Sequence, residues 1–193
     1  PMGELEAQYN KIRLTPFNEQ LPFQGVIKWP RWITTLEKGF VPGDSYTLFQ
    51  VSKARFGAPI CWENNFPEVY RRFVLDGANF MVSVTNESVF GPTSGPHQTL
   101  AMVVFRAVEN RVAVARSATT AVSAFIDPKG RIVSRVSDGN GADLFVRGTL
   151  AWDVPLSEEK SFYTRHGDVF ARAVCAVVLC MLLSCIWRVR RKA

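Results

Sequence analysis

The sequence predicts a layered α/β domain followed by one apolar helix at the carboxyl end. Three observations support this prediction. Two amphipathic helical segments alternate with short apolar runs typical of buried strands, alternating segments follow the second helix, and a long uncharged run lies near the end. With 193 residues, 47% of them apolar, the chain is long enough for one domain with a substantial core.

The amino-terminal part gives few signals of regular structure. Residues 1–10 are polar, and two prolines stiffen residues 11–23 as a loop. Residues 24–46 indicate a helical or irregular excursion that contains Trp29 and Trp32. These two aromatic side chains either contact lipid or pack in the core, and the sequence favours neither.

The first predicted strands and helix surround Cys61. Alternation over residues 46–51 predicts a strand, and the apolar residues 57–61 predict a buried one. A helix is expected from Pro67, which suits the first helical position, and Gly77 suits its end. Cys61 is therefore expected in a tight turn after a buried strand, where a nucleophile is held near backbone N–H groups. The alternative is a small buried apolar residue.

The second half of the domain continues the alternation. Residues 79–85 predict a buried strand, and a loop rich in Gly, Pro and Ser leads to His97. A helix is expected from about Pro96 to Asn110, with apolar residues on its inner face. Further strands are predicted, two of them as a hairpin around Pro128-Lys129-Gly130, at residues 111–116, 121–127, 131–136 and 144–151.

The carboxyl end differs in kind from the rest. Residues 173–187 are uncharged, and residues 169–171 extend this run upstream past the single charge of Arg172, which gives about 19 residues, close to the ~20 that cross a bilayer. The alternative is a buried core helix, but the basic tail is typical of the cytoplasmic end of a span. We therefore expect a domain outside the cytoplasm, a transmembrane helix and a cytoplasmic tail, at residues 1–166, 167–187 and 188–193.

The charge is concentrated in the tail. The formal net charge is +6, and Arg188, Arg190, Arg191 and Lys192 supply four of it. The remainder holds 19 basic and 17 acidic residues, so we expect no nucleic-acid partner.

Cysteine and histidine usage points to thiol chemistry without a metal. Cys61 is the one cysteine outside the apolar run, so it has no disulfide partner in the domain, and a lone thiol there suggests a reactive role. The two histidines, His97 and His166, support a metal site poorly, and we expect no cofactor.

Several motifs resemble a known family. Residues 57–68, GAPICWENNFPE, resemble the nucleophile segment of the nitrilase superfamily, whose core is an α-β-β-α sandwich with a Glu–Lys–Cys triad. Residues 11–22 are similar to the lysine segment and glutamate-bearing loop of bacterial apolipoprotein N-acyltransferases, which belong to that superfamily. Three further segments also resemble those of the apolipoprotein N-acyltransferases, in the same order along the chain: residues 85–98, 106–111 and 126–132. The resemblance implies a nitrilase-like sandwich that is incomplete at the amino terminus. Nothing before Lys11 matches the catalytic glutamate, so the chain alone is expected to be inactive.

The resemblance also implies roles for individual residues. The thiolate of Cys61 would attack a phospholipid acyl ester and pass the acyl group, through a thioester, to the N-terminal amine of a diacylglyceryl-cysteine lipoprotein. Lys11, with the N–H of Trp62, would stabilise the oxyanion. Glu19 and Glu63 match acidic supporting positions, against the alternative of a surface and a turn carboxylate. The Trp62 ring either walls the acyl pocket or packs in the core.

The same resemblance implies a cellular location and the partners of the reaction. It predicts a bacterial inner membrane protein with its catalytic domain on the periplasmic side, a phospholipid donor and a lipoprotein acceptor. Two alternatives remain: a nitrilase-type amidase acting on a small amide, and a non-catalytic membrane-tethered domain. The apolar span disfavours the amidase, because a small polar substrate needs no access to the bilayer. Since this chemistry takes its base from glutamate, we expect a structural role for His97.

Overall fold

One mixed six-stranded sheet organises the domain. The computed structural model describes residues 7–23 and 25–191. Along the sheet, the strands follow one another in sequence order. They are β1 (Phe49–Val51), β2 (Ala54–Gly57), β3 (Phe80–Asn86), β4 (Ala113–Thr119), β5 (Ala124–Ile126) and β6 (Ile132–Arg135). β2, β3 and β4 run parallel to one another, whereas β1, β5 and β6 are each antiparallel to the strand before or after them.

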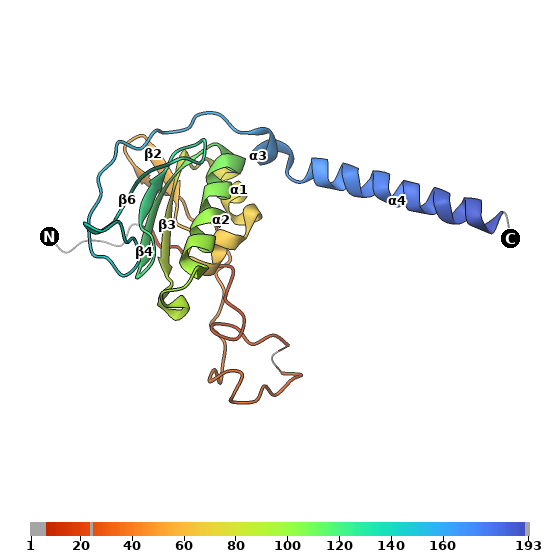
Figure 1. Cartoon of the computed structure of the whole chain (residues 1–193), viewed down its shortest axis with the longest axis horizontal. Helices are drawn as coiled ribbons and strands as arrows, with labels where there is room; N and C mark the ends of the chain where they lie inside the picture. The colour runs from red at the N-terminus through yellow and green to blue at the C-terminus, as the bar shows by residue number, and fades with distance from the viewer. Residues whose placement is uncertain (1–6, 24, 192–193) are drawn as a thin grey trace.

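Two helices cover one face of this sheet (Figure 1). α1 connects β2 to β3 and α2 connects β3 to β4, so two successive crossovers of the same hand place both helices on the same side. The helical elements are η1 (Cys61–Asn65), α1 (Pro67–Asp76), η2 (Ser88–Phe90), α2 (Gly95–Asn110), α3 (Phe162–His166) and α4 (Val169–Arg190).

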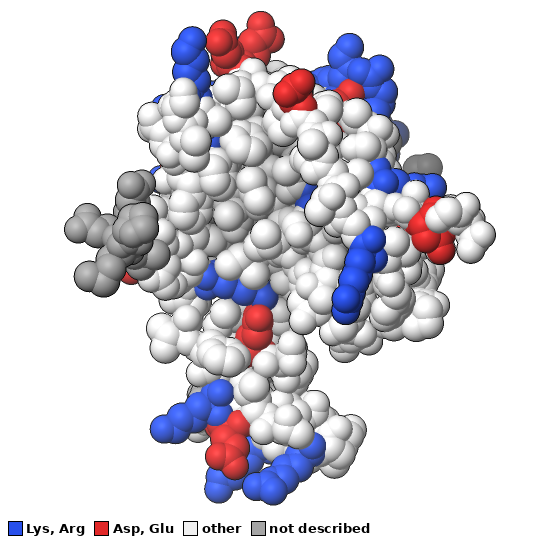
Figure 2. All heavy atoms as spheres, turned by 90° about the vertical axis from the view of Figure 1, so that its left-hand side faces the viewer, with Lys and Arg blue, Asp and Glu red and all other residues white. Residues whose placement is uncertain are grey.

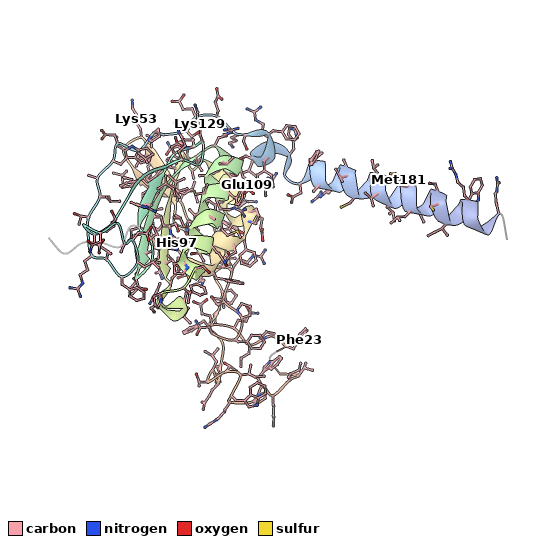
Figure 3. All side chains as sticks on the ribbon, in the orientation of Figure 1. Phe23, Lys53, His97, Glu109, Lys129 and Met181 are labelled. Carbon is pink, nitrogen blue, oxygen red and sulfur yellow. The ribbon has the colours of Figure 1, made fainter. Side chains whose placement is uncertain are left out.

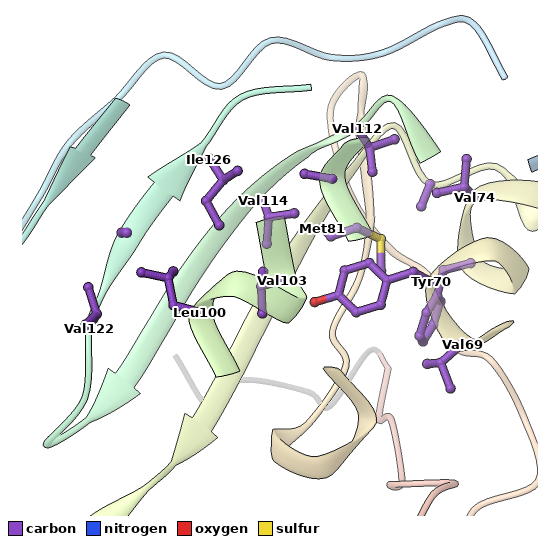
Figure 4. Packing of buried hydrophobic residues seen from close by; sticks show 14 of the residues in the cluster. Val69, Tyr70, Val74, Met81, Leu100, Val103, Val112, Val114, Val122 and Ile126 are labelled. Atoms are coloured by element: carbon purple, nitrogen blue, oxygen red, sulfur yellow. The ribbon is translucent and has the colours of Figure 1, made fainter. Parts of the chain in front are cut away.

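The core fills the space between the sheet and these helices (Figure 4). α1 contributes Tyr70 and Phe73, α2 contributes Val103, and the two central strands contribute Met81 and Val114, all with no exposed surface. The helical spacing of apolar residues therefore identified the inner faces correctly. α1 begins with a proline and ends at a glycine in the left-handed region, as expected.

Two predicted strands differ from the structure. The strand expected at 57–61 is displaced: β2 comprises Ala54–Gly57, and beyond it only an isolated bridge joins Ile60 to Val84 among the described residues, because Pro59 has no N–H to donate to the ladder. The strand expected at 144–151 is wrong: this segment is irregular, since Phe145 adopts a left-handed φ of 59° that interrupts an extended chain.

The long excursion before β1 is irregular and projects from the domain (Figure 1). Within it, the Trp29 ring packs edge-on against Phe17, and its N–H donates to the Pro22 carbonyl at 2.8 Å. Trp32 is 84% exposed, and Phe23 also points outward on this projection (Figure 3). The two tryptophans therefore have different environments: one packs locally and the other faces outward.

Charged side chains are unevenly distributed on the side that faces away from α4. Figure 2 shows Lys, Arg, Asp and Glu gathered at the rim and on the projecting segment, with a largely uncharged centre. Two pairs of aromatic rings involve residues of the sheet. The ring centroids of Phe56 and Phe80 are 5.0 Å apart, and those of Phe125 and Trp152 are 5.4 Å apart.

The carboxyl-terminal helix extends away from the domain (Figure 1). Within the described residues, α4 is the one helix long and apolar enough to cross a membrane, over Val169–Arg188, with a mean hydropathy of 2.5 and no buried surface. It starts two residues after the expected boundary, because Gly167 ends α3 with a φ of 65°. α3 itself is fastened to the domain, where Arg71 Nε donates to the Tyr163 and Thr164 carbonyls.

Candidate active site

Cys61 lies where the chain leaves the sheet and turns into η1. Ile60 forms an isolated bridge with Val84 of β3, and the next residue, Cys61, has a φ of 52°. A left-handed φ is uncommon for a residue with a side chain, and such backbone strain gathers at functional sites. The thiol is half-buried, and its Sγ lies 3.8 Å from the Asn86 carbonyl oxygen at the end of β3. The sulfur is therefore held at the carboxyl end of the parallel strands.

Glu63 joins this turn to the amino-terminal segment. Its side chain is completely buried and accepts four hydrogen bonds. The donors are the Tyr9 hydroxyl at 2.8 Å, the N–H groups of Ile12 at 2.8 Å and Arg13 at 3.0 Å, and the Ile60 N–H at 2.8 Å. Three donors come from the chain around Lys11 and one comes from the residue before Cys61. Glu63 therefore connects the two predicted catalytic residues through the backbone that carries them.

Tyr9 contributes the one side-chain donor to Glu63. Burial, followed by the charge of Glu63, raises the pKa of the Tyr9 phenol well above its usual value. The phenol therefore keeps its proton at physiological pH and remains a donor to the carboxylate.

Lys11 forms an ion pair with Glu19. Its Nζ lies 2.5 Å from Glu19 Oε2 and 3.2 Å from the Thr15 hydroxyl, and its side chain is only 9% exposed. Glu19 Oε2 also accepts the Thr15 N–H at 2.7 Å. Burial alone raises the pKa of the Glu19 carboxyl, but the hydrogen bonds from Lys11 and Thr15 outweigh it and lower the pKa below the ordinary 4.5. The carboxylate is thus charged and holds the lysine in place.

The backbone at Lys11 is also held by a contact with Gly43. The Gly43 N–H donates to the Lys11 carbonyl at 2.8 Å. A Cβ added at Gly43 would lie 2.2 Å from the Asn10 carbonyl oxygen, so only glycine fits this approach.

Asn64 anchors η1 to the interior of the domain. This residue is buried, and its Oδ1 accepts from the Tyr70 hydroxyl at 2.7 Å and from the Ser83 hydroxyl at 3.0 Å. The half-buried Trp62 ring packs edge-on against Phe66, with ring centroids 6.0 Å apart. The turn is thus tied to α1 and to β3.

His97 takes part in a separate contact at the start of α2 (Figure 3). Its Nε2 lies 3.0 Å from Asp143 Oδ1, and Arg135 donates to the other oxygen of Asp143 at 2.9 Å. This arrangement ties α2 to β6 and to the segment after it, which agrees with a structural role for His97.

The structure brings together the chain segments of Cys61, Lys11, Glu19 and Glu63. Sequence reasoning missed Tyr9 and the Asn86 carbonyl. An aromatic residue in an otherwise polar stretch was a weak signal for Tyr9, whereas a backbone carbonyl leaves no signal in the sequence. No group of three or more His, Cys, Asp or Glu side chains is placed to hold a metal among residues 7–23 and 25–191.

A comparison with known families identifies the class to which the chain belongs. Residues 1–162 match the carbon-nitrogen hydrolase family, and the chain therefore belongs to that family. Its fold is the nitrilase fold that the sequence predicted, of which this chain contributes one sheet and its helical layer.

Curated relatives place the chain more closely. It is 37% identical to the apolipoprotein N-acyltransferase of Geobacter metallireducens over 91% of this chain and 33% of the relative. It is 32% identical to apolipoprotein N-acyltransferase 1 of Treponema pallidum over 92% of this chain and 32% of the relative. It is also 33% identical to the apolipoprotein N-acyltransferase of Rhodopseudomonas palustris over 94% of this chain and 33% of the relative. The chain thus spans about a third of the length of the curated relatives it matches.

Solved structures also resemble it. Saccharomyces cerevisiae Nit3 is 25% identical, with a TM-score of 0.46 over 56% of this chain and 42% of that chain. An amidase from Nesterenkonia sp. AN1 is 20% identical, with a TM-score of 0.49 over 68% of this chain and 47% of that chain.

Proposed function

We propose that the protein containing this chain is an N-acyltransferase that acts on lipoproteins. It moves a fatty acyl group from a phospholipid to the N-terminal amine of a diacylglyceryl-cysteine. The observation that carries the proposal is the strained Cys61 turn, which Glu63 joins to the segment of the Lys11–Glu19 pair. The names of the relatives, apolipoprotein N-acyltransferases, support the same activity.

The reaction needs two acyl transfers on one sulfur. In the first, a general base takes the proton of the Cys61 thiol, the thiolate forms a bond to the ester carbonyl carbon, and the glycerol oxygen leaves with that proton as a lysophospholipid. In the second, the lipoprotein amine attacks the thioester, an amide forms, and the thiol is released. Lys11 Nζ and the Trp62 N–H stabilise the oxyanion in both steps, and losing one such donor typically costs ~3 kcal/mol of barrier. Glu19 supports this role by fixing Lys11.

The substrates fit a domain attached to a bilayer. We propose that α4 crosses the membrane from Val169, where the helix begins, to residue 187, and that residues 188–193 form a cytoplasmic tail. The domain before Val169 then lies on the periplasmic side of a bacterial inner membrane. The exposed apolar surface of α4, including Met181 (Figure 3), supports this assignment. A lipid donor and a lipid-modified acceptor are then both within reach, whereas a small amide gains nothing from the anchor.

A mass measurement tests the proposal. The full-length protein in phospholipid vesicles is expected to acquire one fatty-acyl mass on Cys61. A synthetic diacylglyceryl-cysteine peptide should then remove that mass and gain an amide-linked acyl chain. Cys61→Ala should abolish both changes, whereas the matched variant Cys180→Ala, in α4, should retain them. If no acyl mass forms in the presence of phospholipid, the proposal fails, and release of ammonia from small amides would favour an amidase instead.

A further inference from the structure

A buried ion pair lies directly behind the carbonyl that contacts the nucleophile. Glu87 follows Asn86, and its carboxylate lies 2.6 Å from Nη2 of Arg116 on β4. The Arg116 side chain has no exposed surface, and the Glu87 side chain is 4% exposed. The pair therefore lies inside the domain, although residues 88–94, which follow Glu87, are mostly exposed.

Both oxygens of Glu87 are occupied by interior donors. Oε1 accepts from Arg116 and from the Thr85 hydroxyl at 3.2 Å, and Oε2 accepts from the Thr99 hydroxyl at 2.7 Å. Arg116 is fixed in turn, because its Nε donates to the Val122 carbonyl at 3.1 Å. The carboxylate thus ties the end of β3 to β4 and to α2 at one point.

These contacts determine where the Asn86 carbonyl lies. Asn86 is the last residue of β3 and pairs in register with Thr119 of β4. Its side-chain oxygen accepts the Ser88 N–H at 3.1 Å, which turns the chain immediately after it. The Glu87 side chain anchors the peptide that follows. The carbonyl oxygen that lies 3.8 Å from Cys61 Sγ is therefore held from both sides.

The pair is poorly suited to stability alone. Arg116 Nη1 is buried without a hydrogen-bond partner in the part of the chain that the structure describes. Buried ion pairs contribute little net stability, and well-packed apolar residues often replace them without loss. A role beyond stability explains why two charges occupy this position.

We propose that Glu87 and Arg116 form a positioning pair for the nucleophile. They hold the Asn86 carbonyl against Cys61, and this carbonyl accepts the thiol hydrogen and fixes the direction of the sulfur. The inference rests on the proposed function for its kinetic consequences, but its geometric part concerns the reactivity of Cys61 alone. Both side chains are buried away from the surface, so we expect the pair to act on the chemical step rather than on substrate binding.

Four variants of the full-length protein in phospholipid vesicles test this role: Glu87→Gln, Arg116→Met, their double combination, and Glu109→Gln as a control. Glu109 pairs with the largely buried Arg106 at 2.9 Å near the end of α2, so the control removes a comparable charge elsewhere. Four quantities are measured. They are Tm, kcat and KM for acyl transfer to the diacylglyceryl-cysteine peptide, and the rate of Cys61 alkylation by iodoacetamide, read on the Cys61 peptide by mass spectrometry.

Glu87→Gln should lower kcat by about 10²-fold, the cost of a small misplacement of a reacting group, with KM changed less than about twofold. The rate of Cys61 alkylation should change, because the carbonyl that orients the thiol and accepts its hydrogen is displaced. The double variant should recover much of the lost Tm, since no unpaired charge remains, while kcat stays low. Glu109→Gln should lower Tm only.

Recovery of kcat together with Tm in the double variant would overturn the proposal, because the pair would then be purely structural. Unchanged kcat and alkylation in Glu87→Gln would overturn it as well. If Glu87→Gln does not fold, Thr99→Val decides: removing one donor to Glu87 should lower kcat roughly tenfold, and an unchanged kcat refutes the role. If the wild type forms no acyl adduct, the proposed function fails, and the alkylation rates alone decide the positioning role.

Discussion

At the residue scale, Glu63 is the carboxylate on which the site geometry depends most. Replacing it by Gln puts an N–H₂ group where four N–H and O–H donors converge, so at least one donor loses its acceptor. Glu63→Gln should lower the free energy of unfolding by about 2 kcal/mol and reduce acyl transfer strongly. Thermal unfolding and the transfer assay measure the two effects.

Glu68→Gln is the matched control for that variant. Glu68 also pairs with the amino-terminal segment, through Arg13 at 3.1 Å, but both side chains are about half exposed. An exposed pair contributes little, so the control should change stability by less than about 0.5 kcal/mol. Equal effects of the two substitutions would contradict the role assigned to Glu63.

Glu19 gives the site a pH dependence with a defined sign. Its pKa is lowered below 4.5 in the folded state, so its contribution to stability is complete above that pH. The contribution disappears as the pH falls through the folded pKa, when the carboxyl protonates and releases Lys11. Tm of the wild type should therefore fall more steeply below pH 4.5 than Tm of Glu19→Gln. Parallel curves for the two proteins would exclude a stabilising Lys11–Glu19 pair.

Candidate side chains could be identified from the sequence at this scale, whereas backbone groups could not. Cys61, Lys11 and Glu63 carry functional groups that a motif can indicate, and the structure places their segments together. The Asn86 carbonyl and the N–H groups that bind Glu63 belong to every residue alike, so nothing in the sequence singles them out. Their roles follow only from where the chain bends.

At the element scale, the β5–β6 hairpin depends on one aspartate. The Asp127 carboxylate accepts the N–H groups of Lys129 at 2.8 Å and Arg131 at 2.9 Å, and also the Arg131 guanidinium at 2.7 Å. Asp127→Ala should lower the free energy of unfolding by about 1–2 kcal/mol, because these donors lose their acceptor. The activity of the folded fraction should be unchanged, since this turn supplies no group to the site.

Asp138→Ala provides the comparison. Asp138 binds the N–H groups of Asn140 and Ala142 in a similar loop that is exposed to water. Solvent replaces these bonds, so Tm should change less than in Asp127→Ala. A loss of activity per folded molecule in Asp127→Ala would contradict the structural assignment of the hairpin.

The helices were predicted better than the strands for a physical reason. Apolar residues at helical spacing specify both the element and its buried face, as Tyr70 and Phe73 do in α1. Short apolar runs specify burial without specifying extension. Residues 57–61 are mostly apolar, but Pro59 cannot donate to the ladder and the left-handed turn at Cys61 ends the extended segment.

At the scale of the whole molecule, Arg71 controls how the domain is joined to α4. Its guanidinium binds three carbonyl groups of α3, and Thr164 of α3 donates to Asn110 of α2 at 3.0 Å. Arg71→Ala should loosen this joint and lower acyl transfer from phospholipid vesicles several-fold. Alkylation of Cys61 should be unaffected, because the turn itself does not change.

Arg72→Ala is a neighbouring control, since Arg72 forms an exposed pair with Asp76 within α1 at 2.9 Å. It should retain transfer from vesicles. Equal activity of the two variants would show that the α3 contacts do not matter for access to lipid.

The order of the strands has a consequence for how this domain forms. Within the residues that the structure describes, each strand is hydrogen-bonded only to strands immediately before or after it in the chain. No strand has to be inserted between two partners that have already paired, and the longest connections between paired strands are the two helical crossovers at residues 58–79 and 87–112. The sheet can therefore grow one strand at a time while the ribosome is still adding the residues that follow.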